Sequence, residues 1–426
     1  MTIEFFPDVP EICFEGPTSK NPLAFKHYNP KEVVEERTMS DWLRFGLSGW
    51  KPAGASGEDV FTECAIQASP ERNRNSVEVA LRQVDVAFEF LCKLGIPYYC
   101  YRDHDVAPEG DSLLQSNRNI DQLADKLKSQ QALTGVRLLS GTAELSSRRR
   151  YLFGAATSPY ADVFAYAAAQ VKKSMDVTHE LQGQNFVLPI GKEWYGSPHD
   201  MDPMRELDHL ARFIHLASDY AREIGFEGQF LFEVGQQHSA NNQYATDIAS
   251  CMNFVRQFGM MDTVKLNVEW NQAMLSGNSI VRVLEYARTQ TVLGGISIRT
   301  GDALPNDICV ATQVMLTIMA QDGLTPGGIT FEIAGSANDH QAVFRSCVGL
   351  MDLFAYGLKT ASKIRKEGVL FEALKRRYQS FDAGIGKRID QGYSTLEEYM
   401  LQKGEAAFDK SDSQVFIEDL IRGYLQ

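Results

Sequence analysis

The chain has 426 residues, of which 44% are hydrophobic and 23% charged, a composition typical of a folded protein rather than a disordered or fibrous one. Asp and Glu outnumber Lys and Arg by 55 to 42, and the net charge of −13 argues against nucleic acid as a partner. No stretch approaches the roughly 18 uninterrupted apolar residues that cross a bilayer, and the start MTIEFF lacks the features of a signal peptide, so we expect a cytoplasmic protein without membrane contact.

The seven cysteines show no pattern of a zinc site or a disulfide framework. They have no CxxC spacing and their number is odd, which predicts reduced thiols in the core. They are Cys13, Cys64, Cys92, Cys100, Cys251, Cys309 and Cys347.

From about residue 42 onward, short apolar runs rich in β-branched and aromatic residues alternate with longer stretches whose apolar residues recur every three or four positions. This alternation is typical of repeated βαβ units. Eight runs are predicted to be strands: 42–50, 97–101, 136–142, 186–191, 229–234, 264–270, 293–299 and 328–334. Amphipathic helices are predicted between them, one from Val77 to Leu94 that stops before Gly95, and one from Leu207 to Ile224.

Eight apolar strands separated by helices favour an α/β fold in which the strands close into a TIM (β/α)8 barrel, because strands this apolar are buried on both faces. An open doubly wound sheet is the alternative, weakened because no GxGxxG follows the first strand and no GxxxxGK[ST] occurs. The strand pattern stops after about residue 366. We therefore predict a barrel with an N-terminal extension over residues 1–365 and a charged helical tail over 366–426 that wraps a neighbouring subunit or the outside of the barrel.

Functional groups of such barrels project from the carboxyl ends of the strands. Three glutamates converge there, and like charges held together raise one another's pKa, so they predict a bound metal, a paired arginine or a shared proton. The polar residues near the predicted strand ends are Arg102, Asp103, His104, Asp105, Thr142, Glu193, Glu233, Glu269, Ser297, Arg299 and Glu332.

The sequence resembles the larger class of xylose isomerases, which carries an N-terminal extension, nearly from end to end. FEGPTSKNPLAFKHYNP at 14–30 is similar to the opening of that family, and YYCYRDHDVAPEG at 98–110 to its second strand and following loop. Further motifs follow in family order: FGAATSP at 153–159, FLFEV at 230–234, KLNVEWNQAMLSGN at 265–278, TPGGITFE at 325–332 and RYQSFDAGIGK at 377–387.

The resemblance implies a TIM barrel that forms tetramers, in which the C-terminal tail embraces a partner subunit. It also implies two bound divalent cations and the interconversion of an aldose and a ketose by a metal-assisted hydride shift. These implications hold only as far as the residues that perform the chemistry are present.

The catalytic positions depart from the family pattern. Arg102 stands where the family has the histidine that handles ring opening, and arginine cannot act as a general base near neutral pH because it stays protonated. His104, two positions on and so on the same strand face, is a candidate substitute, with an ordinary loop histidine as the alternative. Arg102, His104 and Asp105 form our predicted catalytic group. The family lysine that stabilises the sugar oxygen is Gly235 here.

The ligands of the first, structural metal are partly kept. Glu233 and Glu269 match the two family glutamates, and Glu332 stands where the family has an aspartate. Ser297 replaces the remaining aspartate. Three carboxylates are thus left to hold one cation.

Of the ligands of the second, catalytic metal in the family, fewer are kept in this sequence. Gln272 replaces its histidine, and Asp307 is what remains of two aspartates in a loop that is shorter here. Magnesium takes about six oxygen ligands in near-octahedral order. We therefore predict at most one divalent cation, Mg or Mn, bound by Glu233, Glu269 and Glu332.

A competing hypothesis needs no cation at all. Ser297 and Arg299 are two residues apart on one strand and hence on one face. Arg299 and Arg102 then point into the barrel mouth and neutralise the three glutamates directly. Both hypotheses, one cation or none, stay open at the level of sequence, and metal analysis of the purified protein distinguishes them.

The sugar-lining positions have changed too. Ser140 and Pro189 replace two family tryptophans, while one tryptophan near the first strand is kept. Flat apolar faces usually hold sugar rings, so the pocket has a new shape and a new ligand. The predicted substrate-binding residues are Trp50, Thr142, Trp194, Asn242, Gln272 and Arg299.

Three functional hypotheses follow. The first is a barrel that acts on or binds a different carbohydrate-like, polyhydroxylated small molecule as an isomerase or lyase. The second is a catalytically inactive homologue that serves as a binding or regulatory subunit, in a homo-oligomer or with a paralogue. The third, weak xylose or glucose isomerisation, ranks last because the groups that stabilise the shifting charge are missing.

Overall fold

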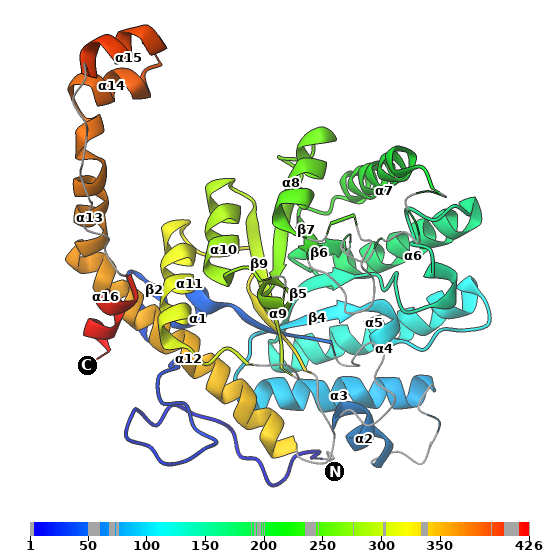
Figure 1. The fold of residues 1–426 in the computed structure, drawn as a ribbon. Coiled ribbons are helices and arrows are strands. Elements are labelled where there is room, and N and C mark those ends of the chain that lie inside the picture. The colour runs from blue at the N-terminus through cyan, green and yellow to red at the C-terminus, as the bar shows by residue number, and fades with distance from the viewer. Residues whose placement is uncertain are drawn as a thin grey trace.

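The structure is a computed structural model that describes residues 4–49, 60–67, 73, 76–188, 190, 193, 197, 199, 201–234, 244–245, 247–275, 277–300, 304–333, 340–392, 394–403 and 417–425. Within these residues, eight parallel strands close into a barrel (Figure 1). The strands are β3 (Phe45–Ser48), β4 (Tyr98–Arg102), β5 (Arg137–Thr142), β6 (Asn185–Leu188), β7 (Gln229–Val234), β8 (Val264–Glu269), β9 (Leu293–Arg299) and β10 (Ile329–Glu332).

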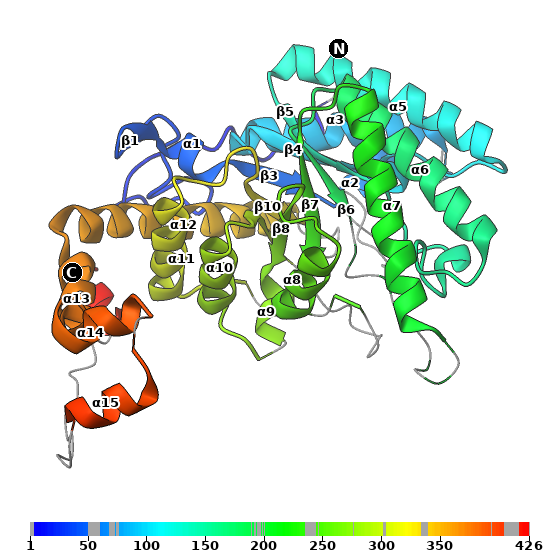
Figure 2. The ribbon, with the colours of Figure 1, turned by 90° about the horizontal axis from the view of Figure 1, so that it is seen from above.

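Each predicted strand is present, although residues 42 and 43 of the first one, predicted as 42–50, belong to a short helix, α1 (Met39–Leu43). Strand β10 pairs with both β9 and β3, which closes the sheet. The TIM barrel is thus confirmed and the open doubly wound sheet was the wrong alternative. Longer helices cover the outside of the barrel (Figure 2). They are α3 (Val77–Leu94), α5 (Leu113–Thr134), α6 (Ala161–Glu180), α7 (Pro203–Glu223), α8 (Ile248–Gln257), α10 (Ile280–Thr289), α11 (Ile308–Ala320) and α12 (His340–Glu367).

Local signals set the helix ends. Helix α3 begins where the Ser76 side chain accepts a hydrogen bond from Val79 N, and it ends at Gly95, whose φ of 63° is easily adopted without a side chain. The predicted stop at Gly95 is confirmed. Shorter helices lie in the connections: α1 (Met39–Leu43), α2 (Val60–Gln67), α4 (Asp103–Val106) and α9 (Trp270–Leu275).

The alternation of side chains along the strands separates the core from the barrel interior. Val268, Ile298 and Phe331 are buried in the main hydrophobic cluster. Their neighbours Asn267 and Thr330 instead line a cavity inside the barrel mouth. A period of two along each strand therefore directs polar residues toward the mouth and apolar residues toward the covering helices.

The N-terminal end of the barrel is closed by Arg44, which precedes β3. Its guanidinium donates to Gly327 O at 2.6 Å, to Tyr98 Oη at 2.9 Å and to Pro326 O at 3.0 Å, and also to the side-chain oxygen of Gln184. These partners come from opposite sides of the barrel, so one buried side chain ties the strand starts together.

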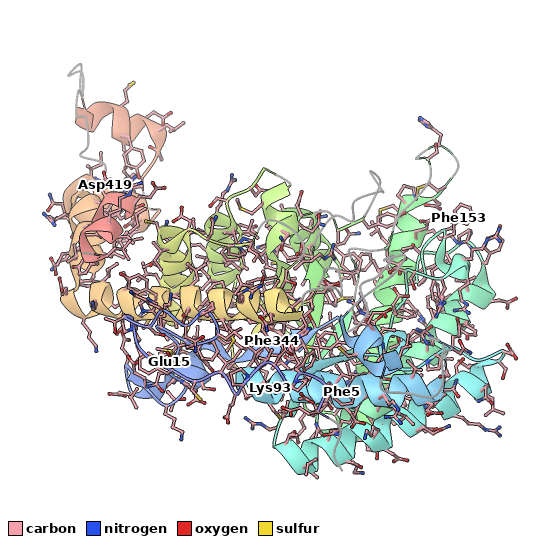
Figure 3. All side chains as sticks on the ribbon, turned by 90° about the horizontal axis from the view of Figure 1, so that it is seen from below. Phe5, Glu15, Lys93, Phe153, Phe344 and Asp419 are labelled. Carbon is pink, nitrogen blue, oxygen red and sulfur yellow. The ribbon has the colours of Figure 1, made fainter. Side chains whose placement is uncertain are left out.

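The N-terminal extension is fastened to two barrel helices by carboxylates. Glu89 on α3 accepts hydrogen bonds from the backbone N–H groups of Phe5 and Phe6 at 2.8 and 2.9 Å, beside Lys93 (Figure 3). Asp352 on α12 accepts three more, from residues 26 to 28, at 2.8 to 2.9 Å. The extension includes a hairpin of β1 (Val33–Val34) and β2 (Arg37–Thr38).

The C-terminal tail is helical, as predicted. It contains α13 (Val369–Tyr378), α14 (Gly384–Asp390), α15 (Leu396–Lys403) and α16 (Ile417–Tyr424). Helices α13 to α15 extend away from the barrel, whereas α16 returns to it (Figures 1 and 2). Ile421 of α16 is fully buried in a small cluster with Cys309 of α11 and Ile364 of α12. The end of the tail thus packs on the outside of the barrel.

All seven cysteines are free. Cys251, Cys309 and Cys347 are buried, as expected of core thiols, but Cys13 and Cys92 are exposed, so the expectation of core thiols was wrong for these two. Among the helices that the structure describes, none is long and apolar enough to cross a membrane.

Candidate functional site

The carboxyl ends of the strands enclose a cavity of about 50 Å³, to which all eight strands contribute. A single water needs about 10 to 15 Å³ of such space, so this described part of the mouth has room for a few water-sized groups. The lining residues are Ser48, Gly49, Cys100, Tyr101, Arg102, Ser140, Thr142, Val187, Glu233, Asn267, Ser297, Thr330 and Glu332.

Four predicted site residues line this cavity: Arg102, Thr142, Glu233 and Glu332. Strand pairing places them at matched heights, with Arg102 opposite Thr142 and Glu332 opposite Arg299. Trp50, Trp194 and Asn242, three predicted substrate-binding residues, lie outside the described residues.

Arg102 is the last residue of β4, and its side chain is only 14% exposed. Its Nη1 lies 3.4 Å from Asp105 Oδ2. Burial acts against the charge, but the carboxylates of Asp105, Glu332 and Glu233, with Glu144 behind them, outweigh burial and raise the pKa of Arg102. The guanidinium is therefore held as a cation among carboxylates and cannot serve as a base.

A second guanidinium pairs with the carboxylate on β10. Arg299 Nη2 lies 3.4 Å from Glu332 Oε2, and Asn271 Oδ1 fixes the strand by accepting from Arg299 N at 3.0 Å. Gly49, with a φ of 66°, makes room for this pair, because a Cβ there would lie 2.5 Å from Glu332 Cγ.

Glu269 ends β8 and begins the next helix. Its carboxylate accepts hydrogen bonds from Gln272 N at 2.6 Å and Asn271 N at 3.3 Å, in the first turn of α9. Burial raises the pKa of Glu269 to about 7 and Glu233 adds to the rise, while the two N–H groups and Arg299 oppose it. This carboxyl therefore changes its protonation state near neutral pH.

Glu233 on β7 differs from the other carboxylates of the mouth. It lines the cavity, yet no hydrogen bond and no ion pair joins its side chain to any residue that the structure describes. It faces Asn267 across the β7–β8 ladder, and Asn267 Nδ2 donates instead to Ser297 Oγ at 3.2 Å. Glu233 is thus available to a ligand.

The expectation that His104 shares the strand face of Arg102 is wrong. Strand β4 ends at Arg102 and the helical turn α4 begins at Asp103, so the period of two no longer applies. His104 is buried and does not line the cavity, and its Nδ1 has no hydrogen-bond partner among the described residues. Its catalytic role stays a prediction.

Two other strand-end carboxylates are structural. Buried Asp103 accepts from Glu144 N and from Gln170 Nε2, both at 2.8 Å, and so joins α4 to α6 and to the loop after β5. Glu193 accepts from Ala155 N at 2.9 Å and from Thr157 Oγ1 at 2.6 Å. Both carboxylates hold loops in place.

Seven lining residues escaped the sequence-based prediction of the site: Ser48, Gly49, Cys100, Tyr101, Val187, Asn267 and Thr330. For Cys100, Asn267 and Thr330 a signal was available, because each lies two residues before one that was singled out and so on the same strand face. Thr142 itself lines the cavity while its Oγ1 donates to Val187 O at 2.6 Å, and buried Gln272 contributes its backbone N–H to Glu269.

The described residues do not fit a pair of metal ions. No three His, Cys, Asp or Glu side chains among them are grouped so as to hold a metal. Arg102 and Arg299 lie against Asp105 and Glu332, where cations would otherwise compensate the carboxylates. A single cation at Glu233, Glu269 and Glu332 stays a prediction.

Comparison with known proteins identifies the family. A protein of Rhodopirellula baltica named xylose isomerase is 44% identical over 433 residues, which cover 99% of either chain. The chain belongs to the xylose isomerase family. The Arabidopsis thaliana protein of the same name is 40% identical over 412 residues, covering 94% of this chain and 86% of that one.

The resemblance inferred from the sequence motifs is thus confirmed for this xylose isomerase family member. Residues 374–425 match the family described as the XylA2 C-terminal domain. A solved structure of L-ribulose 3-epimerase, 12% identical, covers 76% of this chain and 97% of its own with a TM-score of 0.51. At that identity the likeness concerns the fold alone.

Proposed function

We propose that this xylose isomerase family member acts on or binds a carbohydrate-like, polyhydroxylated small molecule at the barrel mouth, without the two-metal aldose–ketose hydride shift. One observation carries the proposal: two guanidinium groups are paired with carboxylates in the mouth, Arg102 with Asp105 and Arg299 with Glu332, each at 3.4 Å. In this proposal the two guanidinium groups are fixed cations that compensate the carboxylate charges of the mouth, a role that a bound metal ion would otherwise have.

The polar lining supports a ligand rich in hydroxyl groups. Serine, threonine and asparagine side chains from β3, β5, β8, β9 and β10 line the cavity and offer both donors and acceptors. In this proposal Arg102, Thr142, Gln272 and Arg299 contact the ligand together with Trp50, Trp194 and Asn242. Arg102, His104 and Asp105 form the catalytic group.

Aldose–ketose isomerisation is the second candidate, favoured by the 44% identity to a relative named xylose isomerase. Removing groups that stabilise a transition-state charge typically costs several kcal/mol each, so we expect this activity to be absent. The assay uses xylose and glucose with Mg or Mn, with metal content of the purified protein measured in parallel. Appreciable turnover, or two bound cations per chain, would overturn the proposal.

Ligand binding separates a working site from an inactive homologue. Calorimetric titration with xylose, glucose and their polyols should give saturable binding that Arg102→Met abolishes. Absence of any binding would favour a regulatory subunit without a small-molecule site. The matched control is Arg149→Met, a change of the same residue type on the exposed surface.

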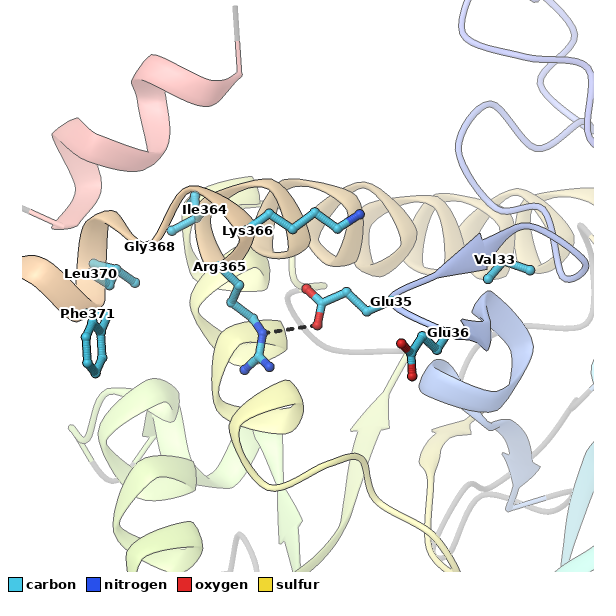
Figure 4. A pocket seen from close by; sticks show the side chains of 9 residues that line it. All are labelled: Val33, Glu35, Glu36, Ile364, Arg365, Lys366, Gly368, Leu370 and Phe371. Carbon is cyan, nitrogen blue, oxygen red and sulfur yellow. Dashed lines mark ion pairs between the residues drawn. The ribbon is translucent and has the colours of Figure 1, made fainter.

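We also propose that the chain is cytoplasmic. Residues 366–426 form a tail that is distinct from the barrel at 1–365, and the chain assembles into a homodimer or tetramer through this tail. Phe371, Leu374 and Tyr378 form one stripe on α13 and are 67%, 57% and 53% exposed. An open groove of about 900 Å³ is lined by Phe371, by the β1–β2 hairpin and by Arg365, which pairs with Glu35 (Figure 4).

Light scattering tests the assembly. We expect Phe371→Ser together with Leu374→Ser to lower the molar mass to that of the 47.6 kDa chain. An unchanged mass would contradict the role of the stripe, and a monomeric native protein would contradict assembly itself. A paralogue as partner would be revealed by a mixed species when the two are coexpressed.

A further inference from the structure

Among the described residues, the charges at the barrel mouth do not balance. Four carboxyl groups belong to the described mouth, those of Asp105, Glu233, Glu269 and Glu332, against two guanidinium groups. Both guanidinium groups already have a carboxylate within 3.4 Å, since Arg102 pairs with Asp105 and Arg299 with Glu332. Two carboxyl groups on the neighbouring strands β7 and β8 are left without an ion-pair partner among the described residues.

These two carboxyl groups differ in the hydrogen bonds that they already accept. Glu269 accepts hydrogen bonds from two backbone N–H groups at the start of α9. Glu233 accepts none from the described residues and lines the cavity. Glu233 is only partly buried, so its carboxylate still meets solvent. A charged donor supplied by a ligand would replace that solvent with a charge-assisted hydrogen bond.

The carboxyl groups of the mouth favour some hydrogen-bond donors of a ligand over others. A neutral hydroxyl offers one hydrogen bond, whereas an ammonium group offers three N–H donors and a compensating charge, and such charge-assisted bonds are roughly twice as strong. A carboxylate-bearing ligand would be repelled by the excess of acids. A divalent metal needs about six oxygen ligands, and the described carboxylates form no group of three that could begin such a shell.

We propose that the ligand of this site carries an ammonium group on its polyhydroxylated chain, as an amino sugar or amino polyol does, and that Glu233 is the residue that recognises it. The inference rests on the proposed function, because it assumes a carbohydrate-like ligand at the barrel mouth. In this arrangement the ammonium group occupies the part of the cavity beside Glu233 and Asn267, on β7 and β8. Serine and threonine hydroxyls of the lining, including Ser48 and Thr142, bind the neighbouring hydroxyl groups.

The test compares three six-carbon polyols that differ only at one end: sorbitol, glucamine with its amine, and gluconate with its carboxylate. Isothermal titration at pH 7 should give a dissociation constant for glucamine at least about tenfold lower than for sorbitol, with gluconate weaker than both. A difference of this size corresponds to about 1.4 kcal/mol.

The variant Glu233→Gln tests whether Glu233 causes the preference for glucamine over sorbitol. It keeps the size of the side chain and removes its charge, so the advantage of glucamine over sorbitol should fall to less than about twofold. The matched control is Glu180→Gln on the surface at the end of α6, where the side chain is 48% exposed and the preference should stay intact. Thermal unfolding of each variant verifies that it is folded.

Four outcomes would overturn the inference. Equal binding of sorbitol and glucamine would reject the ammonium group and leave the proposed function standing. A preference for glucamine that survives Glu233→Gln would reject the residue and point to general attraction by an acidic protein. If Mg or Mn alone binds stoichiometrically and Glu233→Gln removes it, the cation at this site is a metal; if no polyol binds, the proposed function fails as well.

Discussion

The two ends of the barrel use the same side chain in opposite ways. At the N-terminal end Arg44 donates to neutral oxygens, among them Gly327 O at 2.6 Å and Tyr98 Oη at 2.9 Å, and it is 7% exposed. At the mouth Arg102 and Arg299 lie 3.4 Å from carboxylates. The closed end has its donors satisfied within the chain, while the mouth keeps charged groups at longer distances, where a ligand can compete for them.

The pKa values of the arginines also differ between the two ends of the barrel. Burial lowers the pKa of Arg44, and the contact with Tyr98 opposes that change only in part. At the mouth burial acts in the same direction on Arg102, but the surrounding carboxylates prevail and its pKa rises. The comparison teaches that a buried arginine satisfied by neutral oxygens serves stability, whereas one surrounded by an excess of acids marks a site.

The largest expected effect is at the closed end. Replacing Arg44 by Met removes a buried cation and leaves Gly327 O and the Gln184 amide oxygen without a donor, whereas Tyr98 Oη keeps Arg137 Nη2 and Pro326 O keeps Asn185 Nδ2. We expect a loss of about 3 kcal/mol of unfolding free energy. Urea unfolding measures it, and ligand binding should be unchanged in the protein that remains folded.

Arg149→Met is the surface control for this experiment and should change the unfolding free energy by less than about 0.5 kcal/mol. Arg44→Lys should fall between the two, because one ammonium cannot reach all four acceptors. A loss below about 1 kcal/mol in Arg44→Met would show that the closed end does not depend on this residue.

The next effect is a pH dependence at the mouth. The pKa of Glu269 is raised from its usual 4.5 to about 7, so the folded protein binds this proton more tightly than the unfolded chain does. The stability contributed by this proton is fully present below about pH 4.5 and is lost as the pH rises through about 7.

Glu269→Gln removes this titration and still accepts the N–H groups of α9. At 1.36 kcal/mol per pKa unit, the variant should therefore gain about 2 to 3 kcal/mol over the native protein between pH 5 and pH 8. Unfolding by urea at the two pH values measures the gain. A parallel pH dependence of native protein and variant would show that Glu269 is already ionised across this range.

The smallest effect concerns the ion pair between Arg299 and Glu332. Their side chains are partly buried, 28% and 13% exposed, and at 3.4 Å, with solvent still reaching both groups, we expect the pair to contribute about 1 kcal/mol or less. A double-mutant cycle with Arg299→Met and Glu332→Gln should give a coupling energy in that range. A coupling above about 3 kcal/mol would remove the contrast with Arg44.

The elements of this fold could be predicted because each depends on neighbours in sequence. Apolar runs alternating with amphipathic stretches identified all eight strands, and Gly95 marked a helix end since it adopts a left-handed backbone conformation there. The polar residues at strand ends were also evident, because the carboxyl ends of parallel strands meet at one rim.

The partners within the site could not be predicted in the same way. The strand-face argument placed His104 beside Arg102, but β4 ends between them, and a helical turn directs Asp105 to the guanidinium instead. Similarly, Glu193 was named with the mouth residues, whereas the loop at 155–157 binds it. Small changes of backbone direction after a strand decide such contacts, and sequence periodicity carries no information about them.

The order of strands and helices, the helix stops, the family and the set of charged residues near the mouth were determined by the sequence alone, because they depend on local periodicity and on residue identity. The tertiary structure decided which charges neutralise each other. Arg44 finds acceptors up to 283 residues away, and Glu233 finds none among the described residues. Pairing depends on distances of a few ångströms between segments remote in sequence, and those distances exist only once the barrel has closed.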